Sequence, residues 1–153
     1  MSKEELLSAV YGSLISEIEH GAESIMKTQG LSTIQKIYDL LKMFYVHFLN
    51  DPRRARVQLY EVLGVSARID KEYQSAMRKL ASWVALLVRE IFPDTDPEKL
   101  QNSVIPTAAA GAIIEVADQW VLDGLKKPVD DIVTELIDVI TSIGLYLEKN
   151  KKL

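Results

Sequence analysis

An uncharged, alanine-rich segment in the C-terminal third of the chain restricts the possible folds most strongly. Residues 106–114 read Pro-Thr-Ala-Ala-Ala-Gly-Ala-Ile-Ile, and no charged side chain occurs between Lys99 and Glu115. A helix with so little side-chain relief lets the backbone of another helix approach closely. Since apolar residues cover two faces of this helix, it requires two neighbours.

We interpret residues 96–149 as two helices, joined at residues 124–127, that form a homodimer. The second of these helices begins at Pro128 and has a broad apolar face. The alternative is a monomeric bundle in which the pair forms a hairpin in the core. In the dimer, the pair and its copy in the partner form a four-helix bundle. The predicted interface consists of Ala108, Gly111, Ala112, Ile132, Leu136, Ile140 and Ile143.

Helical periodicity and helix-start signals extend along the whole chain and predict an all-α fold of six helices in a single domain, residues 1–153. Ser2 with Glu5, and Ser32 with Gln35, match the capping-box pattern that starts a helix. No segment shows the alternation of a strand. The predicted helices span residues 3–27, 32–49, 53–63, 66–92, 96–124 and 128–149.

The composition argues against several classes of protein. The 153 residues include no cysteine, which removes disulfides, thiolate metal sites and cysteine nucleophiles and fits the reducing environment of the cytoplasm. A net charge of −4 makes the chain a poor partner for nucleic acid, because affinity for a polyanion depends on neutralising phosphates. The acidic start is not typical of a signal peptide, and the longest uncharged run is too short to cross a membrane.

Few residues suggest catalytic or metal chemistry. Glu17 and His20 have the Glu-x-x-His spacing of di-iron bundles, but the chain lacks a second copy of the motif, so we expect no metal. There is no Gly-x-Ser-x-Gly motif and no glycine-rich phosphate loop, so we expect no enzyme activity and no cofactor. His47 lies among aromatic residues and is either a hydrogen-bonded core histidine or a polar group in a ligand cavity.

The order of these signals resembles the regulatory domain of TetR-type bacterial transcription regulators over nearly the whole chain. One departure is large: the three-helix DNA-reading head of that family has no counterpart here. DNA binding is therefore implied only for a parent protein that carries the head. The resemblance rests on residues 2–10, on residues 50–57 with 61–64, and on residues 111–120 followed by Gly124 and the Pro128 helix.

The resemblance implies a homodimeric repressor whose effector, a small apolar or amphipathic molecule, binds among the first, second and fourth helices. The effector would shift the first helix and so change the DNA affinity of the parent protein. A cavity of this kind spans roughly 300–1,000 Å³. The alternative is a headless small-molecule carrier or a dimeric interaction module without a DNA role. Helical phase predicts these cavity walls: Tyr11, Leu14, Ile18, Tyr38, Leu41, Tyr45, His47, Phe48, Tyr73, Met77, Leu80, Ile113 and Val116.

Overall fold

The computed structural model describes residues 1–152, and helices are its only regular secondary structure, which confirms the all-α prediction. None of these helices has the length and unbroken apolar surface that crossing a bilayer requires. The elements are α1 (Lys3–Lys27), α2 (Thr33–Asn50), α3 (Pro52–Ala55), the π-helical segment η1 (Arg56–Glu61), α4 (Ala67–Ile91), α5 (Pro97–Gln101), α6 (Ile105–Leu122) and α7 (Val129–Lys149).

Both predicted capping boxes are present. The backbone N–H of Glu5 donates to the Ser2 hydroxyl at 3.1 Å, and the Ser2 N–H donates to the Glu5 carboxylate at 2.7 Å. Ser32 and Gln35 exchange the same two bonds at the start of α2, at 3.3 and 2.9 Å. Each box satisfies backbone donors that a helix start leaves unpaired, so these two starts are determined by adjacent residues.

The fifth predicted helix is interrupted, so residues 1–152 contain seven α-helices rather than six. Asp96 caps only the short helix α5, accepting from the backbone N–H groups of Glu98 and Lys99. The Ser103 hydroxyl then donates to the Leu100 carbonyl at 2.8 Å, which ends the turn. Pro106 lacks a backbone donor, and it is accommodated because it lies in the first turn of a new helix, α6.

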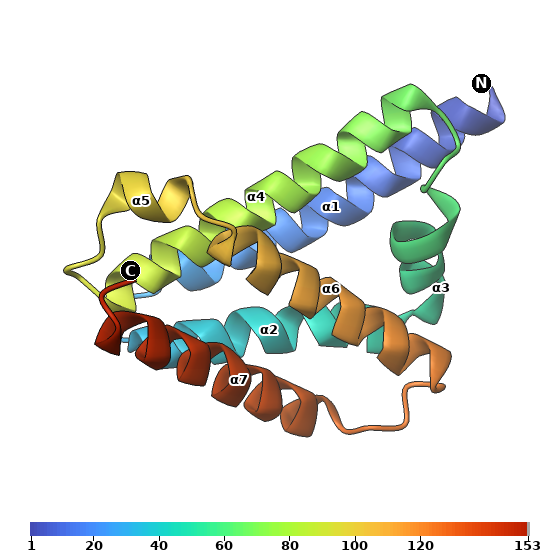
Figure 1. The fold of residues 1–153 in the computed structure, drawn as a ribbon. Helices are drawn as coiled ribbons and strands as arrows, with labels where there is room; N and C mark the ends of the chain where they lie inside the picture. The colour runs from blue at the N-terminus through green and yellow to red at the C-terminus, as the bar shows by residue number, and fades with distance from the viewer. Residues whose placement is uncertain (153) are drawn as a thin grey trace.

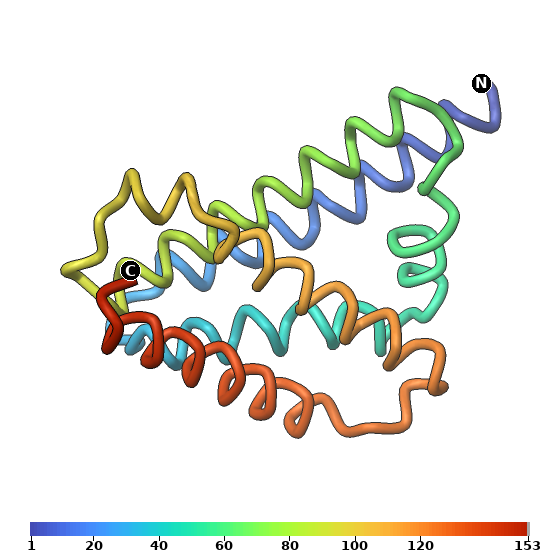
Figure 2. Tube along the Cα trace, in the orientation of Figure 1, coloured from blue at the N-terminus to red at the C-terminus, as the bar shows by residue number. Residues whose placement is uncertain are grey.

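The helices form two layers that α6 connects. Helices α1 and α4 lie side by side along one edge, α2 and α7 lie side by side along the other, and α6 crosses between the layers (Figures 1 and 2). Helix α6 packs mainly against α4, whereas α7 packs mainly against α2. The last two long helices therefore contact α4 and α2 more than each other, although both contribute side chains to the same core.

The main core lies where α2 meets α6 and α7. Tyr45 is fully buried there, and its hydroxyl donates to the Ile113 carbonyl at 2.8 Å. Edge-to-face contacts join its ring to Phe44 and Trp120, with centroid distances of 5.5 and 5.7 Å. Burial of Val133 brings α7 into the same cluster. This core fixes α2 as the central helix, as its nearly all-round apolar sequence indicates.

The predicted dimer-interface residues divide into two groups in this fold. Ile132 and Leu136 are buried in the core with α2, and Ile140 is half-buried, because α7 uses its apolar face to cover α2. On the outer surface, Ala108, Gly111 and Ile143 are exposed and Ala112 is half-buried. The first group therefore stabilises this chain itself, and the second is free to contact a partner.

Candidate ligand-binding site

Two adjoining cavities lie between α1, α2 and α4. We name them the aromatic chamber, about 70 Å³, and the aliphatic chamber, about 100 Å³. Four residues, Ile18, Phe44, Leu80 and Trp83, line both. The aromatic chamber is lined in addition by Tyr11, Ile15, Glu19, Phe48, Gln58, Leu59, Tyr73, Ala76, Met77, Lys79 and Ile114. The aliphatic chamber is lined in addition by Ala22, Ile37, Leu40, Leu41, Met43, Val84, Leu87, Val88, Ile91, Ile113 and Ile140.

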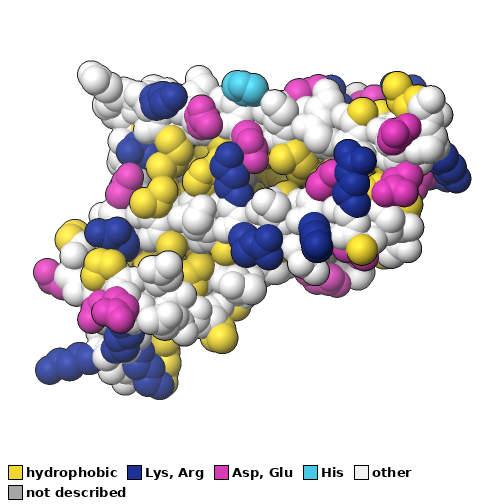
Figure 3. Space-filling view, turned by 90° about the horizontal axis from the view of Figure 1, so that it is seen from above, with side chains coloured by type: hydrophobic (Ala, Val, Ile, Leu, Met, Phe, Trp, Pro, Cys, Tyr) yellow, Lys and Arg dark blue, Asp and Glu magenta, His cyan; other side chains and the backbone are white. Residues whose placement is uncertain are grey.

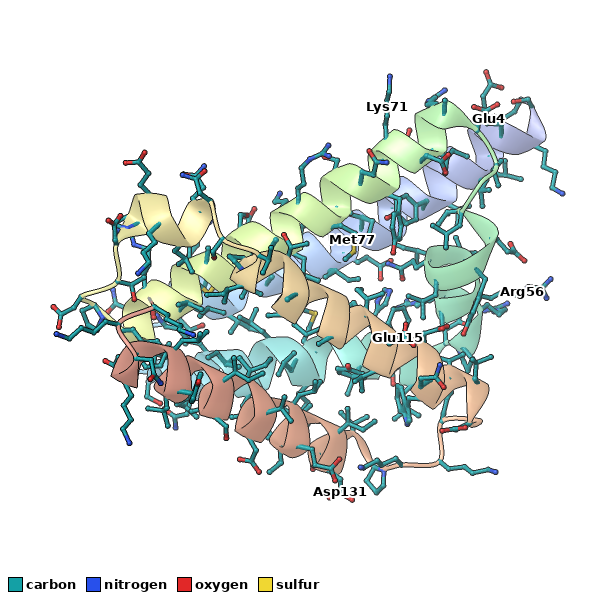
Figure 4. The ribbon with its side chains drawn as sticks, viewed as in Figure 1. Glu4, Arg56, Lys71, Met77, Glu115 and Asp131 are labelled. Atoms are coloured by element: carbon teal, nitrogen blue, oxygen red, sulfur yellow. The ribbon has the colours of Figure 1, made fainter. Side chains whose placement is uncertain are left out.

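Most of the predicted walls lie on one chamber or the other, but each chamber is smaller than the predicted cavity. A bound molecule must therefore enlarge the space or join the chambers. In Figure 4, Met77 lies on the side of α4 that faces the molecule, and Lys71 points away from it. The predicted residues on a chamber wall are Tyr11, Ile18, Leu41, Phe48, Tyr73, Met77, Leu80 and Ile113.

Two predicted tyrosines have structural roles instead. The Tyr38 hydroxyl donates to the Asp130 carboxylate at 2.7 Å on the outside of the α2–α7 pair, where Lys42 contacts the same carboxylate at 2.9 Å. Tyr45 belongs to the core, where its hydroxyl is bonded to the carbonyl of Ile113. Both partners are distant in sequence, so helical phase could not reveal them.

Three further predicted walls lie outside both chambers. Leu14 is half-buried, and neither chamber reaches it. Val116 lines a surface groove between α6 and α7. His47 is buried behind the aromatic chamber in a polar network. The predicted walls did not include Phe44, which lies on the apolar stripe of α2, or Trp83, which lies beside the stripe of α4, although both residues line both chambers.

Gln58 was also missed, and η1 gives the reason. A π-helical turn changes the angular spacing of side chains, so a 3.6-residue period does not predict which side chains point inward. Gln58 is 5% exposed and lines the aromatic chamber. A π-helical turn is a frequent feature of functional sites, and here it places the only side-chain amide of the chamber wall.

A partly buried polar network connects Gln58 to α1. The Arg54 guanidinium lies 2.9 Å from His47 Nδ1 and 3.3 Å from the Glu17 carboxylate, and His47 Nε2 lies 2.7 Å from Gln58 Oε1. Because a guanidinium can only donate, Nδ1 accepts, and the proton of the neutral imidazole is on Nε2. The network therefore links α1, α2, α3 and η1 through a neutral histidine.

Burial lowers the pKa of His47, and the positive charge of Arg54 adds to this, although Gln58, Glu17 and Asp51 act in the opposite direction. The unfolded chain therefore binds a proton on this histidine more readily than the folded chain. The contribution of neutral His47 to the free energy of unfolding is fully present above the ordinary histidine pKa of about 6.5. Stability falls as the pH drops from that value towards the lowered pKa of the folded state.

We expect the melting temperature of the native chain to fall more between pH 7.5 and pH 5.5, a window placed about the ordinary histidine pKa of ~6.5, than that of the His47→Gln variant. Differential scanning calorimetry in buffers of equal ionic strength measures both. The His20→Gln variant is the control, since His20 is exposed on α1. If the melting temperature falls equally in the native chain and in the His47→Gln variant, His47 is not a neutral, buried histidine.

An ion pair lies between the aromatic chamber and the surface. The Lys79 ammonium is 3.0 Å from the Glu19 carboxylate, and both residues line the chamber and an outer groove of about 350 Å³ between α1 and α4. Seen from this side, apolar side chains lie along the seam between the two helices, with charged side chains beside them (Figure 3). Opening this pair would widen the connection between the chamber and the outer groove.

The Glu-x-x-His residues do not act together. Glu17 pairs with Arg54, and His20 Nδ1 lies 2.8 Å from the carbonyl of Ser16 in its own helix. Within residues 1–152, no group of three histidine or acidic side chains lies close enough together to hold a metal ion.

A separate surface groove, the α6–α7 groove of about 580 Å³, includes Val116. Its floor is apolar, formed with Trp120 and Leu136, and its rim is polar, with Glu115 and Glu135 on opposite helices. The outer stripe of α7 continues the apolar surface at Val139, Ile143 and Tyr146, which are 54, 53 and 60% exposed. This succession at intervals of four and three residues is typical of a helix that packs against another helix.

The chain was compared with protein-family models, with curated proteins and with solved structures. None of the three comparisons gives a match.

Proposed function

We propose that this chain is the effector-binding and dimerisation domain of a TetR-like transcriptional repressor, whose DNA-reading head lies outside these residues. The observation that carries the proposal is the connection between the chambers and α1. Helix α1 forms one wall of both chambers, and Gln58 on the aromatic chamber is linked to Glu17 of α1 through His47 and Arg54. A molecule in the chambers therefore acts on the helix that would carry the head.

The small size of the chambers supports a mechanical response. A molecule larger than about 100 Å³ must push α1, α2 and α4 apart or move Phe44, which lines both chambers. The heads of a dimer must match half-sites about 34 Å apart, so a modest shift of α1 reduces affinity for DNA. The effector changes this equilibrium only as far as it binds the shifted arrangement better than the unshifted one.

The proposed homodimer uses the outer faces of α6 and α7. The α6–α7 groove has an apolar floor and a polar rim, which is the usual anatomy of a protein interface. The exposed side of α6 at Gly111 has no atom within 4 Å of the position of a β-carbon, so a partner helix can approach its backbone. In a two-fold arrangement, Val139 and Ile143 of each protomer would meet the other protomer, in keeping with an isologous contact.

A chimera tests the regulatory role. The helix-turn-helix head of a well-characterised TetR-type repressor is fused before Ser2, and binding to the operator of that head is measured by fluorescence anisotropy. We expect the chimera to bind the operator and the isolated 153-residue chain to show no sequence-specific binding, because its net charge is −4 and no recognition helix is present.

Two outcomes count against this role. Specific operator binding by the isolated chain would contradict the assignment of DNA reading to the head. In a second test, Leu80→Trp fills the aromatic chamber of the chimera. If operator binding then stays unchanged, the small-molecule carrier is the better interpretation, since a carrier needs no response of α1.

A further inference from the structure

We infer that the two chambers bind a single-chain alkyl carboxylate, with the carboxylate in the aromatic chamber and the alkyl chain in the aliphatic chamber. This inference deepens the proposed function and rests on it for the identity of the site. It is carried by three observations: the hydrogen-bond donors that line one chamber, the apolar wall of the other, and the narrow, elongated space that they share.

Four hydrogen-bond donors line the aromatic chamber beside the Glu19 carboxylate. Within residues 1–152, the hydroxyl groups of Tyr11 and Tyr73 form no hydrogen bond, and the amide nitrogen of Gln58 forms none either, because its oxygen is the atom that meets His47. The ammonium group of Lys79 is a fourth donor, and its acceptor is the Glu19 carboxylate. A ligand head that only accepts hydrogen bonds satisfies these groups, and a carboxylate accepts up to four.

The charge of Lys79 selects a carboxylate over a neutral acceptor. Lys79 lies at the boundary between the chamber and the outer groove, held by Glu19. A ligand carboxylate that enters along the α1–α4 seam can replace Glu19 as its partner and keep the ammonium neutralised. Hydrogen bonds between charged groups are stronger than neutral ones, so a carboxylate head would preserve the strength of the bond that Lys79 now makes to Glu19, whereas a neutral acceptor would weaken it.

The aliphatic chamber suits a hydrocarbon chain and little else. Every side chain on its wall is apolar, including the walls from α4 between Leu80 and Ile91. At a rise of about 1.5 Å per residue, the α4 residues from Tyr73 to Ile91 extend the combined wall over ~27 Å. The chambers, about 70 and 100 Å³, must widen for any ligand of this length, and a single chain requires less widening than a fused-ring ligand.

Phe44 separates the two chambers. Its half-buried ring lines both and packs edge-to-face on Phe48 at a centroid distance of 4.9 Å. Rotation of this ring would join the chambers into one channel. A flexible chain can pass such a constriction, whereas a rigid ring system would need α1 and α4 to separate first.

The two tryptophans allow a direct test. Trp83 lines both chambers, and Trp120 lies on the α6–α7 groove. The probe is stearic acid brominated in the middle of its chain, because bromine quenches a nearby indole. The Trp120→Phe variant reports on Trp83 alone and the Trp83→Phe variant on Trp120 alone. We expect the probe to remove most of the Trp83 fluorescence and to leave that of Trp120 unchanged.

The head assignment is tested by titration with the same quenching signal. Lys79→Gln should weaken binding of the brominated acid about tenfold, the effect of losing one charged hydrogen bond. Lys71→Gln is the matched control, because Lys71 is an exposed lysine of the same helix and points away from the chambers (Figure 4). An alkyl trimethylammonium probe of the same chain length should bind more weakly than the acid.

Several outcomes would overturn the inference. They are quenching of Trp120 in place of Trp83, quenching of neither, equal binding of the acid and the ammonium probe, and equal effects of Lys79→Gln and Lys71→Gln. Failure of the proposed function is distinguishable: the acid would then quench Trp83 without moving α1. Anilinonaphthalene sulfonate serves as a second probe of a different shape. If it moves α1 while the brominated acid does not bind, the proposed regulatory function stands and the alkyl-carboxylate inference is wrong.

Discussion

Replacement of Tyr45 by alanine is expected to lower the free energy of unfolding by about 3–5 kcal/mol, the usual cost of deleting a buried aromatic ring. The side chain is 0% exposed and lies among residues of α2, α6 and α7. Its removal leaves a cavity at the centre of the main core. Equilibrium unfolding in urea, followed by circular dichroism, measures the change.

Two matched variants separate the contributions. Tyr45→Phe keeps the ring and removes only the 2.8 Å hydrogen bond to the Ile113 carbonyl, so it should cost about 0.5–1.5 kcal/mol. Tyr146→Ala should change stability by less than about 0.5 kcal/mol, since Tyr146 is 60% exposed. If Tyr45→Ala is no more destabilising than Tyr146→Ala, the core described above is wrong.

The second large effect concerns the oligomeric state. We expect the native chain to be a dimer and Ile143→Asp to be a monomer. The substitution would place two unpaired carboxylates in the proposed interface, one from each protomer, and burial of an unpaired charge costs several kcal/mol. Because Ile143 is 53% exposed in the single chain, the fold of each protomer should be unaffected.

Multi-angle light scattering at tens of micromolar protein measures the mass directly. Leu63→Asp is the control: this leucine is 49% exposed and follows η1, away from α7 (Figure 1). A native chain that is monomeric, or an Ile143→Asp variant that stays dimeric, would refute an interface on the outer face of α7.

Features that depend on neighbouring residues could be predicted from the sequence. The helix starts at Ser2 and Ser32 are examples, since the cap and its partner are three residues apart. The break before α6 was missed because Pro106 fits the first turn of a helix and also the interior of an otherwise continuous apolar pattern. The choice between these depends on the Ser103 hydroxyl bond to Leu100, which no periodicity contains.

The candidate site was predicted in part for a similar reason. Helical phase identifies an inward stripe, so Ile18 and Leu80, in the middle of that stripe, lie on both chambers. It does not identify which neighbour covers the stripe. Tyr38 is directed outward by Asp130, a residue 92 positions away, and Gln58 is directed inward by a π-helical turn.

The central claim is that occupancy of the chambers moves α1. Because the chain contains no cysteine, Ser13→Cys gives a single labelling site on the exposed side of α1, and Asp138→Cys gives a control site on α7. Electron–electron double resonance between the two spin labels of a dimer measures each distance. Stearic acid, at a concentration that saturates Trp83 quenching, should shift the distance at Ser13 and leave that at Asp138 unchanged. If Trp83 is saturated and the distance at Ser13 does not change, α1 does not respond to the ligand and the account is contradicted.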